Sequence, residues 1–316
     1  MNYLRYQIRH STIYDYSAQV TEADHVIKLK PRELPRQRLH SFELHVSPTC
    51  EMNTPLADYF GNESAVVTHR QALTQLEITA RSEVDVALPY IPNPAETPVW
   101  ETVRGRILTD RSVASLEAIE CTYESDMVDT PNGIADYALE SFFPRRPVLE
   151  AAKELTERIF NDFAFDPSAT TTTTPVSEVF ANRRGVCQDF AHFQIACLRS
   201  IGMAARYVSG YLETDPPPGS PRLVGADASH AWVSIYCPEI GWIDLDPTNG
   251  CLPSLRHITI GWGRDYYDIC PIRGVVNGGG NPILSVGVDV LAQGPVQEDV
   301  SHNLVPANES TLPSSS

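Results

Sequence analysis

The sequence RRGVCQDFAH at residues 183–192 leads from a glycine-containing turn into a strongly apolar stretch. From Phe190 to Ile201, apolar residues occupy nearly every face of a helix, a pattern typical of a central, buried helix. Gly202 is expected to end it. Cys187 is therefore predicted at or just before the first helical turn, where free backbone N–H groups favour a negative charge. Such a position stabilises a thiolate, which is the nucleophilic form of cysteine.

A histidine and an aspartate are predicted to lie side by side in the region that follows this helix. Three short stretches there have the composition of strands: residues 204–212, 231–236 and 242–245. His230 directly precedes the second and Asp246 directly follows the third, and the five residues between these two strands suit a hairpin. In an antiparallel pair the start of one strand lies beside the end of the other, so Asp246 can orient the His230 ring. Asp244 shares that face but lies further from His230.

Each of these residues also has a purely structural interpretation. A lone Cys187 can be a small core residue, because free cysteines are commonly buried. His230 can be a satisfied structural group, and Asp246 can cap the turn that follows it. Asp189 and His192 lie one turn apart on the helix and are either a second reactive pair or support for the helix. We favour support, because His192 is on a different helical face from Cys187.

Composition limits the classes of partner and site. The chain has 316 residues, of which 42% are hydrophobic and 20% charged, enough for two domains with a sizeable core. A net charge of −16 argues against a nucleic-acid partner. The seven cysteines form no CxxC pair, which favours reduced thiols in the cytoplasm over a zinc site or disulfides. No signal peptide, membrane-spanning run or ligand cluster is evident, so we expect no membrane partner, metal or organic cofactor.

The chain is expected to divide into two domains and a tail. Many short strands and turns predict an antiparallel β-sandwich-like domain at residues 1–98, which ends in a proline-rich edge. Residues 99–296 are expected to form the second domain, with a helix at 148–159 and a last strand at 283–291. Residues 105–145 have no clear pattern. The threonines at 170–174 predict a solvated loop, 216–221 a proline-rich loop, and 297–316 a disordered tail.

Three separated segments resemble the core motifs of the transglutaminase-like superfamily: GVC at 185–187, SHAW at 229–232 and GWIDLDPT at 241–248. The resemblance implies an α+β fold with a papain-like core, in which a helix carrying Cys187 packs on an antiparallel sheet carrying His230 and Asp246. It also implies their roles: Cys187 is the nucleophile, His230 the base, and Asp246 orients the histidine.

The resemblance extends over nearly the whole chain, to about residue 291. Residues 6–16 and 58–62 resemble the N-terminal β domain of bacterial transglutaminase-like proteins, and GRDYYD at 263–268 resembles their C-terminal part. Bacterial relatives of this kind are often associated with ATP-grasp-type peptide-forming enzymes. The resemblance therefore implies such an enzyme as a partner in a peptide-tag pathway.

Three functions are compatible with these residues. The first is a cysteine peptidase or amidase that cleaves a peptide or protein through a thioester, with the Cys187 N–H and the Gln188 side chain holding the oxyanion. The second is a protein-glutamine transglutaminase, in which an amine resolves the thioester. Gln188 stands where animal transglutaminases have an aromatic residue, and their large C-terminal β domains are absent, so we favour hydrolysis. The third is a non-catalytic peptide-binding module.

Overall fold

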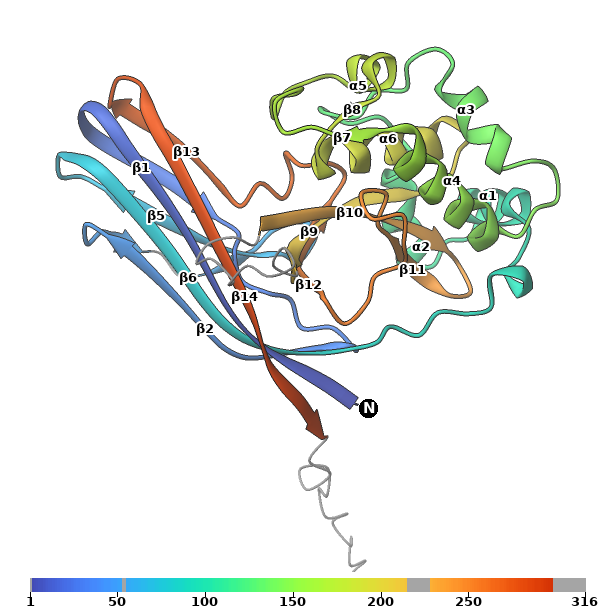
Figure 1. Cartoon of the computed structure of the whole chain (residues 1–316), viewed down its shortest axis with the longest axis horizontal. Coiled ribbons are helices and arrows are strands. Elements are labelled where there is room, and N and C mark those ends of the chain that lie inside the picture. Colours follow the sequence, from blue (N-terminus) through green and yellow to red (C-terminus); the bar gives the residue numbers. More distant parts are fainter. Residues whose placement is uncertain (1, 53–54, 215–227, 298–316) are drawn as a thin grey trace, which may run out of the picture.

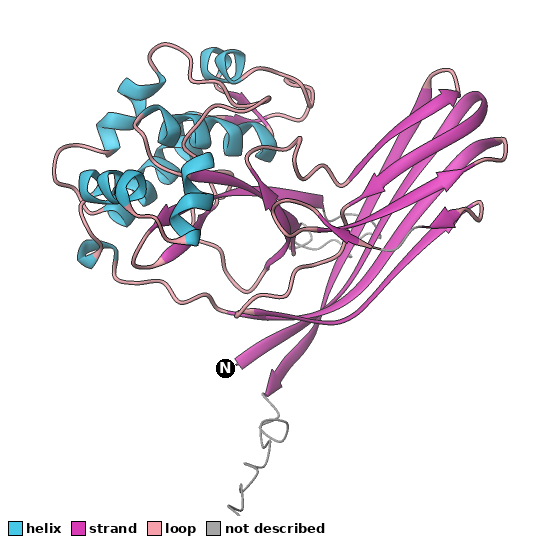
Figure 2. Ribbon diagram, turned by 180° about the vertical axis from the view of Figure 1, so that it is seen from behind, coloured by secondary structure: helices cyan, strands magenta, loops and turns pink. Residues whose placement is uncertain are grey.

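Two antiparallel sheets and a group of helices build the structure, a computed structural model that describes residues 2–52, 55–214 and 228–297. The long strands run side by side on one side of the molecule, and the helices gather on the other, with the smaller sheet between them (Figure 1). Seen from behind, all the helices cover the same side of the smaller sheet (Figure 2). The α+β class expected from the sequence is confirmed.

The larger sheet is eight-stranded and centred on β1 (Asn2–Ile27). Its other strands are β2 (Gln37–Ser47), β3 (Glu51–Met52), β4 (Leu56–Ala57), β5 (Glu63–His69), β6 (Leu73–Ala87), β13 (Ile272–Gly278) and β14 (Pro282–Gln297). Leu76, Ile78 and Ala80 are buried at every second position of β6, the period of a strand with one covered face. The pairing of β1 with β6 shifts between Asp15 and Val20, where the sheet bends.

The last two strands do not lie in the part of the structure to which the predicted domain division assigned them. We expected residues 99–296 to form one catalytic domain, but β13 and β14 pair with β1 and extend the N-terminal sheet. β14 covers the edge of β1 that β6 leaves open, along residues 2–16, so both edges of that long strand are hydrogen-bonded. The boundary at residue 98 itself stays a prediction, and the predicted tail beyond residue 297 lies outside the described residues.

The smaller sheet has four strands in the order β11 (Gly241–Leu245), β10 (Ala228–Cys237), β9 (Ala205–Leu212) and β12 (His257–Gly263). The turn between β10 and β11 is shorter than predicted, because β10 continues to Cys237 and β11 starts at Gly241. One face of the sheet contributes Tyr211, Ile258 and Ile260 to a core shared with the larger sheet. The other face packs on helix α6.

Six α-helices and one short 3-10 helix complete the described chain: η1 (Pro94–Glu96), α1 (Trp100–Thr109), α2 (Val113–Glu120), α3 (Ile134–Ser141), α4 (Val148–Asp162), α5 (Val176–Asn182) and α6 (Cys187–Ser200). The predicted apolar face of α4 is buried, and α6 is buried on nearly every side. Between α4 and α6, the two-residue strands β7 (Ala164–Phe165) and β8 (Arg184–Gly185) pair in parallel.

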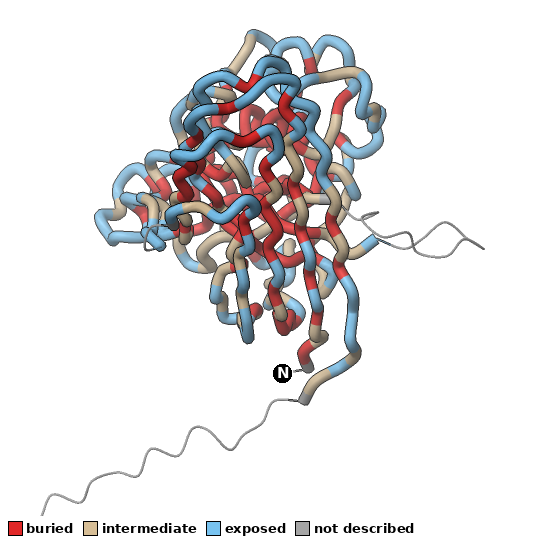
Figure 3. The backbone as a smooth tube through the Cα atoms, turned by 90° about the vertical axis from the view of Figure 1, so that its left-hand side faces the viewer, coloured by how far each residue is buried: buried red, intermediate tan, exposed pale blue. Residues whose placement is uncertain are grey.

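The helices α1, α2 and α3 fill the stretch that had no clear sequence pattern. They are short, and exposed apolar residues such as Leu108, Val113 and Leu116 interrupt the period expected of an amphipathic helix. Buried segments concentrate in the interior, while the outer turns are exposed (Figure 3). Within the described residues, no helix has the length and apolar character needed to cross a membrane. The predicted proline-rich loop at residues 216–221 lies outside the described residues.

Candidate active site

Cys187 is the first residue of α6 and is partly exposed. Asp189 caps this helix: its Oδ2 accepts hydrogen bonds from the Val186 N–H at 2.8 Å and from Thr170 Oγ1 at 2.6 Å. A Cβ atom on Gly185 would lie 2.5 Å from the same Oδ2, so only glycine leaves room for the cap. The cap, the glycine and the backbone N–H groups together fix the thiol at the positive end of a buried helix.

His192 supports the helix rather than forming a second reactive pair. Its ring is buried, and its Nε2 accepts the backbone N–H of Tyr266 at 3.1 Å. Burial lowers the pKa of His192 to about 4, against the opposing charge of Asp265. A neutral imidazole that accepts a backbone hydrogen bond is a structural group. Asp189 and His192 thus both make structural contacts, as the helix-support interpretation predicted, and the absence of a reactive role stays a prediction.

The antiparallel hairpin brings His230 and Asp246 together as the sequence predicted. Val233 on β10 pairs with Leu245 on β11, which places the start of β10 beside the end of β11. His230 Nε2 lies 2.7 Å from Asp246 Oδ2, with both residues buried. Asp244, two residues earlier, instead accepts hydrogen bonds from the Ser234 hydroxyl and, at 3.5 Å, from Arg36 Nη2.

Asp246 also caps the turn after β11, as the structural interpretation predicted, while the same carboxylate contacts His230. Its Oδ1 accepts the backbone N–H groups of Thr248 at 2.9 Å and Asn249 at 3.2 Å. Its Oδ2 accepts the Asn249 side-chain amide at 2.7 Å in addition to His230. A carboxylate held on both oxygens cannot rotate, and it therefore keeps the histidine ring in one orientation.

A second histidine, His257, contacts the same carboxylate and was not identified from the sequence. Its Nε2 lies 3.0 Å from Asp246 Oδ2, and its Nδ1 accepts the Ser254 backbone N–H at 3.2 Å. The bond to Ser254 places the ring proton on Nε2, which donates to Asp246. β10 and β12 both run antiparallel to β9, so both begin at the same end of the sheet. The sequence signal was a histidine starting a strand, but the strand order was needed to use it.

The electrostatics favour a charged pair. Burial alone raises the pKa of Asp246, but hydrogen bonds from His230 and His257 outweigh it and hold that pKa far below its usual range. Burial alone lowers the pKa of His230, whereas hydrogen bonds with Asp246 and Cys187 and their charges raise it to about 10. His230 is therefore held as an imidazolium. Since its Nε2 is bonded to Asp246, Nδ1 is the nitrogen left for Cys187.

The cluster of His230, Asp246 and His257 has the composition of a cation site, with one ligand atom from each within 4.8 Å of the others. Its contacts are nevertheless those of a hydrogen-bonded group. The Ser254 N–H leaves the His257 proton on Nε2, and His230 Nε2 lies at hydrogen-bond distance from Asp246 Oδ2. Both nitrogens thus donate to Asp246 and have no lone pair directed at a metal.

The residue after Cys187 connects α6 to the threonine-rich loop. Gln188 Nε2 donates to the Thr172 carbonyl at 2.9 Å, so this amide is already engaged, and its role at the oxyanion stays a prediction. Thr172 also lines a cavity of about 480 Å³ together with Tyr266 and Tyr267.

Comparison with known protein families gives two matches. Residues 6–85 match the bacterial transglutaminase-like N-terminal region, and residues 139–247 match the transglutaminase-like superfamily. The second range contains Cys187, His230 and Asp246. The two matched regions correspond to most of the larger sheet's N-terminal strands and to the helix and hairpin of the site.

Of three relatives, two span both regions and the third matches a shorter part of the chain. An uncharacterized protein of Mycobacterium tuberculosis is 40% identical over 307 residues, which are 94% of this chain and 95% of the relative. An uncharacterized protein of Mycobacterium leprae is 28% identical over 90% of this chain and 98% of its own length. A protein-glutamine gamma-glutamyltransferase of Pseudomonas aeruginosa is 33% identical over 107 residues, covering 31% of this chain and 16% of that enzyme.

A solved structure shares the fold across the chain. It is a Cytophaga hutchinsonii protein provisionally named a cysteine protease, with a TM-score of 0.74 over 93% of this chain and 92% of its own. Its sequence identity is 19%, so this likeness concerns the fold.

Proposed function

Because the chain belongs to the transglutaminase-like superfamily, whose fold serves cysteine-dependent enzymes, we propose that it hydrolyses an amide bond in a peptide or protein. Cys187 is the proposed nucleophile, His230 its acid and base, and Asp246 the residue that orients the histidine. One observation carries this proposal: a buried imidazole is hydrogen-bonded to Asp246 at 2.7 Å and interacts with the thiol at the start of a helix.

The geometry suggests how each group acts. The Sγ of Cys187 attacks the amide carbonyl carbon, and the C–N bond breaks as His230 donates its Nδ1 proton to the leaving amine. Water then gives a proton to His230 and its oxygen to the acyl carbon, which releases the acid and regenerates the thiolate. The backbone N–H of Cys187 at the helix start stabilises the oxyanion in both steps.

A transglutaminase activity is the second candidate. An amine would replace water in the second half-reaction, and the same three residues would serve. The similarity of 107 residues to a protein-glutamine gamma-glutamyltransferase favours this candidate, although those residues are only 16% of that enzyme. The expected ATP-grasp-type partner and the cytoplasmic location stay predictions. A non-catalytic module is the weakest candidate, because the proposed nucleophile, base and aspartate are all present.

Thiol reactivity tests whether the site is catalytic at all. Iodoacetamide at neutral pH is expected to alkylate Cys187 much faster than Cys50, Cys251 or Cys270, which are also partly exposed. Mass spectrometry of each cysteine-containing peptide over time gives the rates. Similar rates at all four would contradict both enzymatic candidates.

Peptide libraries separate hydrolysis from transfer. The full chain and the Cys187→Ala variant are incubated with the library, with and without a primary amine, and the products are identified by mass spectrometry. Cleaved or deamidated peptides that require Cys187 support hydrolysis. Amine adducts as the main product would replace the hydrolase assignment by transfer.

A further inference from the structure

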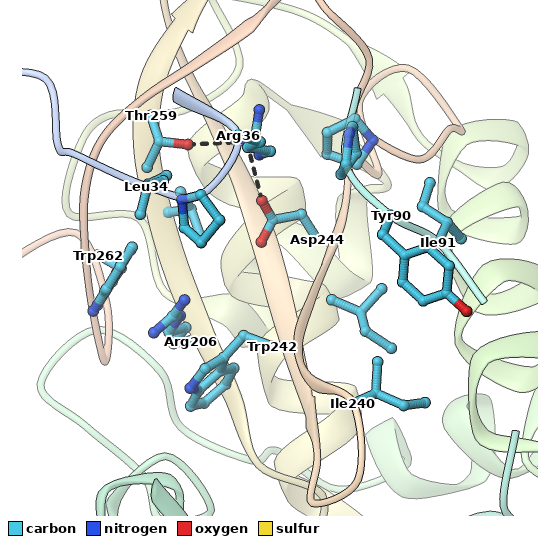
Figure 4. Close-up of a pocket in the computed structure, with 15 residues that line it drawn as sticks. Leu34, Arg36, Tyr90, Ile91, Arg206, Ile240, Trp242, Asp244, Thr259 and Trp262 are labelled. Carbon is cyan, nitrogen blue, oxygen red and sulfur yellow. Dashed lines mark hydrogen bonds and ion pairs between the residues drawn. The ribbon is translucent and has the colours of Figure 1, made fainter. Parts of the chain in front are cut away.

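We propose that a second cavity binds a small organic carboxylate with an apolar body. This cavity lies at the end of the smaller sheet opposite to His230 and Asp246. The cavity has a volume of about 330 Å³ and lies where β9, β11 and β12 meet the loop after β1 and the segment after β6 (Figure 4). Its charged lining residues are Arg36, Arg206 and Asp244. This inference does not depend on the chemistry proposed for Cys187.

Arg206 is the residue that points to a ligand. Its guanidinium carbon lies 4.2 Å from the ring centre of Trp242 and 3.8 Å from that of Trp262, so indoles cover it on two sides. Its Nε is buried, and it has no hydrogen-bond partner within the described chain. Figure 4 shows Arg206 beside both tryptophans at the cavity. Stacking holds the guanidinium in place, while no described residue accepts a hydrogen bond from its Nε.

The nearby carboxylate of Asp244 does not supply the hydrogen-bond partner that Arg206 lacks. Asp244 is bonded to the Ser234 hydroxyl and to Arg36, whose Nη2 also reaches Thr259 Oγ1 at 3.1 Å. The attraction of Asp244 for Arg206 is electrostatic, and no hydrogen bond joins these two side chains among the described residues. Two guanidinium groups thus face one carboxylate, and the cavity wall has one positive charge in excess. In a chain of net charge −16, such a local excess favours an anion.

The planar shape of the Arg206 guanidinium favours a carboxylate among the possible anions. A guanidinium edge presents two parallel N–H groups that match the two oxygens of a carboxylate. The remaining wall is largely apolar and includes Ile91, Ile240 and Ile243. These residues suit a compact hydrocarbon or aromatic body rather than a highly charged anion. Benzoate and hexanoate have both features, and they serve as probes.

Direct binding tests the proposal. Isothermal titration of the full chain with benzoate is expected to show saturable binding, and benzamide, its neutral analogue, is expected to bind at least about tenfold more weakly. Tryptophan fluorescence should change with benzoate, since Trp242 and Trp262 border the cavity. Equal binding of both probes, or no saturable binding of either benzoate or hexanoate, would overturn the proposal.

Variants locate the site. Arg206→Gln is expected to weaken benzoate binding at least about tenfold, and Arg206→Lys, which keeps the charge but loses the planar fork, by less. Arg104→Gln is the matched control, because Arg104 also stacks on a tryptophan, Trp100, but does not line this cavity. Unchanged affinity in both Arg206 variants would place the ligand elsewhere and contradict the proposal. Arg206→Lys keeps the test valid if Arg206→Gln does not fold.

Discussion

The two ends of the smaller sheet differ in how far the hydrogen-bonding capacity of a buried charged group is satisfied. At the end where β10 and β12 begin, both oxygens of Asp246 accept hydrogen bonds, and two histidines share one of them. At the other end, Arg206 lies between two indole rings with its Nε unpartnered among the described residues. A saturated network holds one geometry, as a reacting group requires, whereas an unsatisfied donor keeps its capacity for a partner from outside.

The largest expected effect comes from Asp246→Asn at the saturated end. Asparagine has the same shape, but its amide cannot accept two imidazole N–H groups while it holds the turn, so turnover should fall about a thousandfold. The pKa of His230, raised to about 10 by Asp246 and Cys187, should fall when the carboxylate charge is removed. Because the acid needed for the leaving amine is then lost at lower pH, the alkaline limb of the pH–rate profile should move down.

The measurement for Asp246→Asn is hydrolysis of a library-derived substrate between pH 5 and 11, with thermal unfolding as a check on the fold. Asp268→Asn, on a carboxylate that binds Arg264 at 2.9 Å, is a control for loss of a partly buried charge. An unchanged alkaline limb in Asp246→Asn would contradict the role given to this aspartate.

Arg199→Met addresses an arginine that, unlike Arg206, is fully engaged. Its guanidinium donates to the backbone carbonyls of Cys121 at 3.1 Å, Ala205 at 3.0 Å and Arg264 at 2.6 Å. Methionine fills similar space but leaves buried carbonyl groups with fewer donors, so the free energy of unfolding should fall by about 3 kcal/mol. Urea denaturation followed by circular dichroism measures this change. A loss below about 1 kcal/mol would mean that these hydrogen bonds are not what holds α6 to the sheet.

His257 is expected to act as a positioning residue, because it contacts Asp246 at the end of the sheet where the hydrogen bonds are satisfied. His257→Phe removes one donor from the carboxylate and should slow turnover about tenfold, while His257→Gln, which retains an N–H donor, should recover most of it. The alkaline limb should shift slightly in the phenylalanine variant. Equal turnover and pH profiles in both variants, at equal thermal stability, would show that the residue only fills space.

The sequence predicted the parts of this architecture that depend on neighbouring segments. The position of Cys187 followed from a helix start, and the meeting of His230 with Asp246 followed from a hairpin. His257 was missed because its contact depends on β12 joining the far side of β9. The partnership of β14 with β1 was missed for the same reason, since local periodicity says nothing about pairing across the length of the chain.

The cavity around Arg206 was equally hidden from sequence reasoning. Trp242 and Trp262 come from different strands, and Arg36 comes from a loop far away in the chain. No short motif links such residues. A site assembled from five separate segments is visible only once the strand order brings them together.

The smallest expected effect is that of Arg206→Met on stability, and it separates the two arginines most sharply. Burial lowers the pKa of Arg206 to about 9, which means that the folded protein holds this charge at a cost that methionine removes. The stacking on Trp242 and Trp262 is lost in exchange, and no hydrogen bond to Nε is broken. The free energy of unfolding should therefore stay within about 1 kcal/mol of the parent value. A loss as large as that of Arg199→Met in the same urea titration would identify Arg206 as a structural arginine, and the contrast between the two ends of the sheet would disappear.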